Sequence, residues 1–190
     1  EDGATIYTEA LPKFGFSPSG PGGKIQVDAD RLRLDGGARI YTNTLAASAS
    51  GAIELSISDS LRLSEVSQIY TEAGSPVPEG GAVSATGPAG NIRVSTGEAV
   101  LEGASNIRST THSAGKSGDI DLAANGLVSL SDESQIYTEA SGSTAAMTGR
   151  AGDLRVVAED ISAVGASNFR STTLTGAATG AVELTARSGL

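Results

Sequence analysis

The chain has 190 residues, a net charge of −9, and neither Cys nor Trp. The acidic balance argues against binding to nucleic acid or to anionic membrane surfaces, since both require clusters of Lys and Arg. The absence of Cys excludes disulfides and thiolate metal sites. No apolar run approaches the roughly 18 residues of a membrane span, so we expect no direct membrane insertion.

A repeated motif opens the chain and indicates its organisation. Ile-Tyr-Thr-Glu-Ala occurs at 6–10, 69–73 and 136–140, and Arg-Ser-Thr-Thr occurs at 108–111 and 170–173. Self-similarity at such spacings is typical of solenoids, in which each repeat contacts mainly its neighbours. We predict one segment over 1–190 that contains three repeats of two coils each. The chain begins and ends partway through a coil, so we expect a slice of a longer array.

Three short strands are predicted in each coil that follows the first motif. In the first of these coils, one strand contains Ile25 and Val27, a second contains Leu32 and Leu34, and a third begins at Ile40. Apolar and polar residues alternate with a period of two, which indicates strands with one buried face. With no helical period anywhere, this pattern predicts an all-β fold, a right-handed parallel β-helix of about six coils. The first-strand anchors are Ile25, Ile53, Ile92, Ile120, Leu154 and Val182.

Long and short connections alternate between the coils. Coils that end in Tyr-Thr-Glu-Ala carry the long ones, at 11–24, 73–89 and 140–152. Insertions on one side of a solenoid often form its binding face. Their large apolar residues Phe14, Phe16, Val77 and Met147 are therefore candidate contacts with a host glycan, a matrix protein or an adjacent filament. Alternatively, the connections fold back and cover the flank of the rod.

Stacking of the coils would also place equivalent residues side by side on the outer surface. Neighbouring rings at strand spacing can stack, and an exposed guanidinium over a ring adds about 0.5–1 kcal/mol. Such a stripe either stabilises the rod surface or forms a flat aromatic strip for a sugar ring or a neighbouring rod. The outward position after the third-strand anchor reads Tyr7, Tyr41, Tyr70, Arg108, Tyr137 and Arg170.

The two positions after this stripe carry hydroxyls and carboxylates. The first points inward, and we expect its hydroxyls to hydrogen-bond along their own column. The second points outward and carries Glu on every second coil, which keeps like charges off adjacent strands. The inward residues are Thr8, Thr42, Thr71, Ser109, Thr138 and Ser171, and the glutamates are Glu9, Glu72 and Glu139.

The sequence shows no residue cluster of the kind that catalysis or metal binding needs. The aspartates are scattered over turns, and His112 is the only histidine, which we expect to be solvated. The Gly-Gly-x-Gly-x-Asp repeat of calcium-bound β-rolls is missing. We therefore expect no enzymatic activity, no cofactor and no structural metal. Because some β-helices cleave polysaccharides through clustered carboxylates, such an enzyme remains the least favoured alternative.

Three segments carry a family resemblance, namely Ala-Gly-Asn-Ile-Arg-Val (89–94), Ser-Gly-Asp-Ile-Asp-Leu (117–122) and Ala-Gly-Asp-Leu-Arg-Val (151–156). They resemble the repeats of filamentous-haemagglutinin-type exoproteins, which Gram-negative bacteria secrete through the two-partner route. The segments 36–40 and 103–107 fit the same pattern. The resemblance implies a right-handed β-helical rod outside the outer membrane, and many members of that family are adhesins.

From these features we expect a secreted or cell-surface structural rod that mediates adhesion by presenting loops and surface ladders. Its partners would be a host or matrix glycan or protein. The main alternative is the shaft of a polymerising filament that binds no ligand, with copies associating head to tail or laterally.

Overall fold

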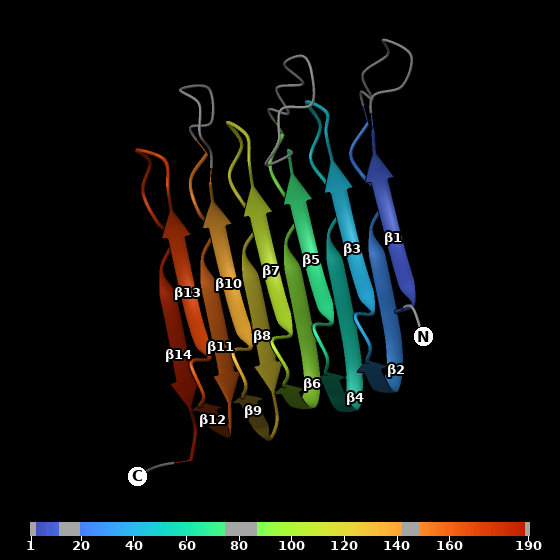
Figure 1. The fold of residues 1–190 in the computed structure, drawn as a ribbon, viewed down its shortest axis with the longest axis vertical. Helices are drawn as coiled ribbons and strands as arrows, with labels where there is room; N and C mark the ends of the chain where they lie inside the picture. Colours follow the sequence, from blue (N-terminus) through green and yellow to red (C-terminus); the bar gives the residue numbers. More distant parts are fainter. Residues whose placement is uncertain (1–2, 12–19, 75–86, 142–148, 189–190) are drawn as a thin grey trace.

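The computed structural model describes residues 3–11, 20–74, 87–141 and 149–188. Within these residues all regular secondary structure is β-strand, without a helix. The strands form a six-stranded and an eight-stranded sheet (Figure 1). Neighbouring strands pair in parallel, as in β1 with β3 and β2 with β4. The predicted all-β, parallel character is therefore confirmed, and the arrangement fits a parallel β-helix or solenoid.

The six-stranded sheet contains the predicted third strands, in full register. Each pair aligns six residues, so Ile6, Ile40 and Ile69 lie side by side, as do Ile107, Ile136 and Phe169. Alignment of the repeats in sequence therefore corresponds to alignment in space. The strands are, in spatial order, β1 (Thr5–Ala10), β3 (Arg39–Thr44), β5 (Gln68–Ala73), β7 (Asn106–Thr111), β10 (Gln135–Ala140) and β13 (Asn168–Thr173).

The eight-stranded sheet departs from the prediction of two separate strands per coil. In β2 (Ile25–Leu34), β4 (Ile53–Leu63) and β6 (Ile92–Leu101) the first and second predicted strands are continuous. In both pairings of β4 the register shifts at one point, where Ser58 and Asp59 lie opposite a single residue of β2 and of β6. This extra residue is a β-bulge, which bends a strand while its pairing continues. The predicted separation appears only in later strands, β8 (Ile120–Ala124) with β9 (Leu127–Leu130) and β11 (Leu154–Ala158) with β12 (Asp160–Ala163). The last strand is β14 (Val182–Ala186), which pairs with β11.

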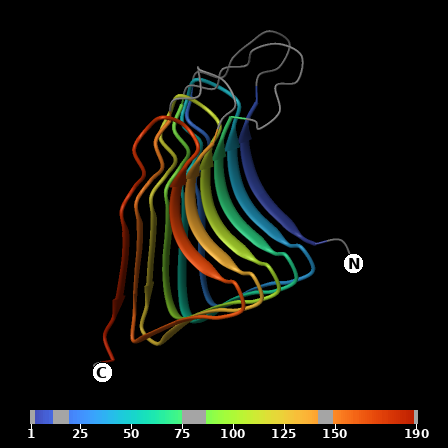
Figure 2. The same ribbon diagram turned by 60° about the vertical axis from the view of Figure 1, so that its left-hand side comes forward.

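The core lies between the two sheets and is built from stacked aliphatic side chains. Ile53, Ile69, Ile92 and Ile107 are fully buried, and each repeats a side chain of the neighbouring turn of the chain. Burial of such a side chain contributes about 1.5–3 kcal/mol. Figure 2 shows the successive turns stacked behind one another around this common interior. The thin interior explains why the fold needs so few aromatic residues.

The corner between the second and third strands is a two-residue turn with positive φ. It is formed by Gly36–Gly37, by Gly103–Ala104 and by Gly165–Ala166, but also by two pairs without glycine. Glu65 and Val66 have φ of 52° and 64°, and Asp132 and Glu133 have φ of 53° and 65°. The N–H of the second turn residue donates to the next turn of the chain, as Val66 does to the Gly103 carbonyl at 2.8 Å. This ladder holds the non-glycine residues in a conformation that they rarely adopt.

The corner before the first strand is built on a column of glycines. A Cβ on Gly51, Gly90, Gly118, Gly152 or Gly180 would overlap the carbonyl oxygen of the equivalent glycine one turn earlier. The Asn or Asp that follows links the turns through its side chain. Asn91 Oδ1 accepts from the Asp119 N–H at 2.9 Å, and Asp119 Oδ1 accepts from the Asp153 N–H at 2.7 Å. The recurring Gly-Asn/Asp pair is therefore a stacking element.

The inward hydroxyl column is buried as predicted, but its hydrogen bonds differ from the expectation. Thr42, Thr71, Ser109 and Thr138 are fully buried. Their hydroxyls donate mainly to the glycine column, as Thr71 Oγ1 does to the Gly90 carbonyl at 2.6 Å. In the part of the chain that the structure describes, only Thr71 and Ser109 bond directly along the column, at 2.8 Å. The glycine carbonyls point inward and offer acceptors nearer than the hydroxyl of the next strand.

Candidate functional site

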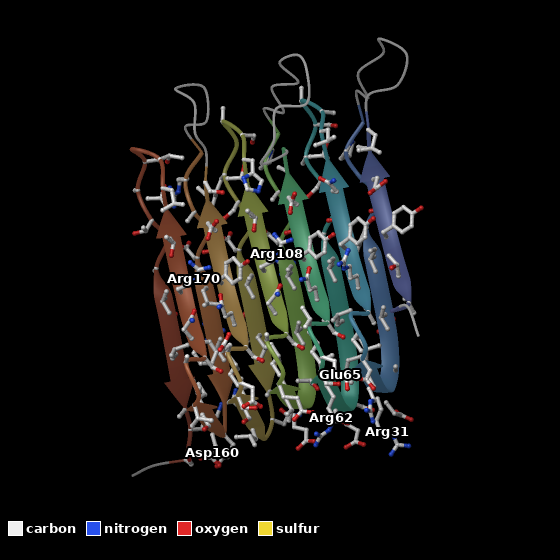
Figure 3. All side chains as sticks on the ribbon, in the orientation of Figure 1. Arg31, Arg62, Glu65, Arg108, Asp160 and Arg170 are labelled. Atoms are coloured by element: carbon white, nitrogen blue, oxygen red, sulfur yellow. The ribbon has the colours of Figure 1, made fainter. Side chains whose placement is uncertain are left out.

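The outward stripe forms one continuous ladder across the six-stranded sheet. Register places Tyr7 beside Tyr41, Tyr41 beside Tyr70, and Tyr70 beside Arg108. Tyr137 lies between Arg108 and Arg170, which Figure 3 labels on the outer face of β7 and β13. The sequence therefore placed all six residues in the correct order. We call this set the Tyr/Arg ladder.

The rings of the ladder stack on one another. Tyr7 and Tyr41 have centroids 5.3 Å apart with planes inclined by 12°, and Tyr41 and Tyr70 are 4.8 Å apart at 3°. The guanidinium carbon of Arg108 lies 4.4 Å from the Tyr70 centroid, and that of Arg170 lies 4.3 Å from the Tyr137 centroid. These are favourable stacking and cation–π distances. The strand spacing of about 4.8 Å allows this contact at every step.

This stacking changes what the ladder can offer to a ligand. Each ring plane faces along the stack, so both faces of Tyr41 and the Arg108-facing side of Tyr70 are covered. Tyr7 is 56% exposed. A sugar ring that lies along the ladder therefore meets mainly ring edges and hydroxyls. The proposed contact with a glycan or a neighbouring rod remains a prediction, and the edges of the tyrosine rings are the surface that would make it.

Each glutamate beside the ladder is held by a partner on the next strand. Arg108 Nη1 lies 3.1 Å from Glu72 Oε2, and Arg170 Nη2 lies 3.4 Å from Glu139 Oε2. In the first pair of strands, the Tyr41 hydroxyl donates to Glu9 at 3.0 Å. Each arginine therefore contacts two side chains of the preceding strand. The planar face of its guanidinium covers the tyrosine ring, and the edge of the guanidinium pairs with the carboxylate.

The environment of the ladder shifts the pKa of its tyrosines. Burial, followed by the hydrogen bond to Glu9 and the charge of that carboxylate, raises the pKa of Tyr41 to about 12. Burial also raises the pKa of Tyr70 and of Tyr137, partly opposed by the nearby guanidinium of Arg108. The phenols are therefore neutral at physiological pH and can donate hydrogen bonds at the ring edges.

His112 is not the solvated residue that we expected. It is half-buried beyond the end of β7, and its Nδ1 lies 2.9 Å from the Ser141 hydroxyl on the next turn. Desolvation lowers the pKa of His112, opposed by the charge of Glu72. Thr110, two residues earlier on the outer face, is only 2% exposed. Twenty-nine residues separate His112 from Ser141, and only alignment of the residues just after each third strand could have indicated the pair.

The predicted loop contacts Phe14, Phe16, Val77 and Met147 lie outside the described residues. Among the residues that the structure does describe, no group of three or more His, Cys, Asp or Glu side chains could hold a metal ion. The same part of the chain contains no helix long and apolar enough to cross a membrane.

The two sheets of parallel strands and the laddered surface are the features by which the chain can be classified. They fit the class of β-solenoids. No protein-family model, no curated protein and no solved structure matches the chain.

Proposed function

We propose that the protein is a structural rod of the bacterial cell surface or a secreted one, and that it mediates attachment. In this proposal the fold is a right-handed parallel β-helix of about six coils, organised as three two-coil repeats. The rod presents its surface groups to a partner, because a stiff stack of coils holds these groups in fixed positions. The Gly-Asn/Asp segments that resemble filamentous-haemagglutinin repeats are the elements that stack the turns.

The observation that carries the proposal is the unbroken Tyr/Arg ladder. It runs across all six strands of one sheet without a register shift. Tyr41 and Tyr70 are each held between two stacked groups, and Arg108 and Arg170 each pair with a carboxylate on the adjacent strand. Such fixed groups lose little conformational entropy when a partner binds, which favours recognition by a rigid surface.

The ladder also offers a defined chemistry to a partner. Its outer edge presents neutral phenol hydroxyls next to paired carboxylates and guanidinium groups. Hydrogen-bonding edges of this kind suit a glycan or the polar surface of a matrix protein.

Binding of the purified protein to a glycan array and to immobilised matrix proteins tests the proposal. We expect a signal that falls in a Tyr7→Ala/Tyr41→Phe variant, which removes one exposed ring and the hydroxyl of a second. A Tyr→Ala change inside the stack is avoided because it would also disturb packing. Retained signal in the variant would contradict the ladder as the contact surface, and no binding to any partner would contradict attachment.

Light scattering at increasing protein concentration distinguishes the filament alternative. An attachment rod is expected to bind its partner at concentrations where its mass does not grow. Growth of the mass with concentration, together with no binding on either array, would favour a polymerising shaft instead.

A further inference from the structure

A groove lies on the eight-stranded sheet, where β2, β4 and β6 bend between their two halves. Its volume is about 530 Å³, within the range of ligand-binding clefts. It crosses four successive turns of the chain, so its length along the stack is about three strand spacings, or roughly 14 Å. The lining residues are Asp28, Ala29, Asp30, Ser56, Ile57, Ser58, Ser95, Thr96 and Asn125.

The bulge of β4 shapes the groove. Ser58 and Asp59 of this strand lie opposite a single residue of β2 and of β6, so the chain bends at this point. Ile57 is buried and forms part of the floor, as does the nearly buried Thr96. At the end of the groove, the continuous strand is replaced by a turn that carries the exposed Asn125. The groove is therefore a product of the backbone path and does not depend on the rotamer of one side chain.

Polar groups repeat along the groove at the strand spacing. Asp28, Ser56 and Ser95 are in register on adjacent strands, and all three are exposed. The fourth position of this column is Ala123, which ends the series. A second line of polar groups contains Asp30 and Ser58, which share a hydrogen bond of 2.7 Å. A ligand that satisfies these groups must itself present polar groups at regular intervals along the stack.

The charge of the groove limits the class of ligand. Asp28 accepts a hydrogen bond from Gln26 at 3.2 Å, and neither Asp28 nor Asp30 has an ion-pair partner among the described residues. The nearby Arg31 is directed to Asp59, 3.8 Å away. Carboxylates are strong acceptors for hydroxyl donors, and they repel anionic ligands.

We propose that this groove binds a linear, neutral oligosaccharide that lies along the stacking direction. A sugar chain supplies hydroxyl donors at regular intervals, fills a long shallow groove and carries no charge that the aspartates would repel. The lining contains no aromatic ring, so the site relies on hydrogen bonds and its affinity is modest. The groove and the Tyr/Arg ladder lie on different sheets. Because a glycan bound in either place gives a signal on an array, the two sites are distinguished by the groove amides and by variants of the groove.

Amide chemical-shift mapping of the isotope-labelled protein tests the site. The probes are the neutral hexasaccharides cellohexaose, maltohexaose and chitohexaose in its N-acetylated form, with hexagalacturonate as the anionic comparison and hexalysine as the cationic one. We expect at least one neutral probe to shift the amides around Asp28, Ser56 and Ser95. Hexagalacturonate should leave the same amides unshifted.

The matched variants are Asp28→Ala/Asp30→Ala and Asp121→Ala. Loss of two charge-assisted acceptors should weaken binding of the neutral probe at least about tenfold. Asp121 lies on the same sheet outside the groove, where it pairs with Arg155 at an exposed site, and its variant should bind as the parent does. Circular dichroism melts show whether each variant folds.

Three results would overturn the proposal. One is the absence of any shift in the groove amides with all three neutral hexasaccharides. Another is equal affinity of the folded Asp28→Ala/Asp30→Ala variant and the parent. The third is binding of hexalysine in the groove while the neutral probes do not bind, which would assign the site to a cationic peptide.

Discussion

Two kinds of strand alternate over β5, β7, β10 and β13 of the six-stranded sheet, and their outward side chains complement each other. Strands β5 and β10 present a tyrosine and a glutamate, namely Tyr70 with Glu72 and Tyr137 with Glu139. Strands β7 and β13 present Arg108 and Arg170 at the tyrosine position. Each arginine covers the ring and pairs with the carboxylate of the strand before it. Neither kind of strand could stack on a copy of itself without placing like charges side by side.

The first pair of strands reaches the same result without an arginine. Strand β3 carries Tyr41 where β7 carries Arg108, and its ring stacks on both Tyr7 and Tyr70. Its hydroxyl donates to Glu9, as the guanidinium of Arg108 does to Glu72. The position therefore requires a flat group with a donor at its outer edge, and either a phenol or a guanidinium satisfies it.

The largest effect is expected at the corner that both kinds of strand share. In a Gly118→Val variant, the new Cβ would overlap the Gly90 carbonyl oxygen. This oxygen belongs to the backbone and already accepts the Thr71 hydroxyl at 2.6 Å. We expect a loss of about 3 kcal/mol in the free energy of unfolding, measured by urea denaturation.

Gly176→Val is the matched control for this change. A Cβ at Gly176 would meet no atom within 4 Å, so we expect stability close to that of the parent. If both variants lost the same stability, the cause would be the flexibility of glycine in general and not the close approach of stacked turns.

The next largest effect is expected from Arg108→Ala. The change removes the cation–π contact with Tyr70 and leaves Glu72, whose side chain is only 16% exposed, without its cation. We expect a loss of about 2 kcal/mol, because a partly buried carboxylate without a partner is costly. Arg170→Ala leaves Glu139, whose side chain is 19% exposed, without its cation in the same way, and we expect a loss of similar size. A much smaller loss in the Arg170 variant, measured by urea denaturation, would assign the cost to the burial of the arginine, which is 18% exposed at Arg108 and 37% at Arg170.

Replacement of Arg108 by tyrosine sharpens the same comparison. In Arg108→Tyr the new ring would stack on Tyr70 and its hydroxyl would approach Glu72, as Tyr41 does toward Glu9. We expect this variant to keep more than half of the stability that Arg108→Ala loses. A loss as large as that of the alanine variant would show that the charge of the guanidinium, and not its shape, is required.

A smaller effect, with the opposite sign, is expected at the corner turn. The strands β3, β7 and β13 follow turns whose first residue is Gly36, Gly103 or Gly165, whereas β5 follows Glu65 with a φ of 52°. A Glu65→Gly variant removes this strain, and we expect a gain of about 1 kcal/mol. Gly103→Ala, at a φ of 63°, is the reverse change and should lose a similar amount. Thermal unfolding of the two variants measures both effects.

The residues of the ladder could be predicted from the sequence because stacking in register makes aligned positions into neighbours. The alignment of Tyr7, Tyr70 and Tyr137 was sufficient to place them on one face. The orientation of the rings could not be predicted, because it depends on side-chain rotamers and not on register. For that reason the sequence suggested a strip of rings with their faces exposed, whereas in the structure the rings stack face to face and expose their edges.

The corners of the fold were the least predictable part. Glu65 and Val66 carry no glycine that would indicate positive φ, and only their alignment with Gly36 and Gly37 could have pointed to the turn. The fusion of the two predicted strands was missed because the inward alternation breaks at the join, where Leu32 follows Ala29 after three residues although the pairing of the strands continues. The groove was missed with it, because this break indicates a gap between two strands as readily as a bend within one.

The smallest effect is expected from pH, and it distinguishes the phenol from the guanidinium in the ladder. The pKa of Tyr41 is raised to about 12 in the folded protein from its ordinary value of 10.0. Between about pH 10 and pH 12 the unfolded chain therefore loses this proton first, and the stability that Tyr41 contributes is lost as the pH rises. Tyr41→Phe should reduce this decline, measured as the free energy of unfolding in urea. The difference in tyrosinate absorbance between the folded parent and folded Tyr41→Phe shows the same ionisation directly, and a midpoint of this difference near pH 10 would contradict the shielding of Tyr41 by its neighbours.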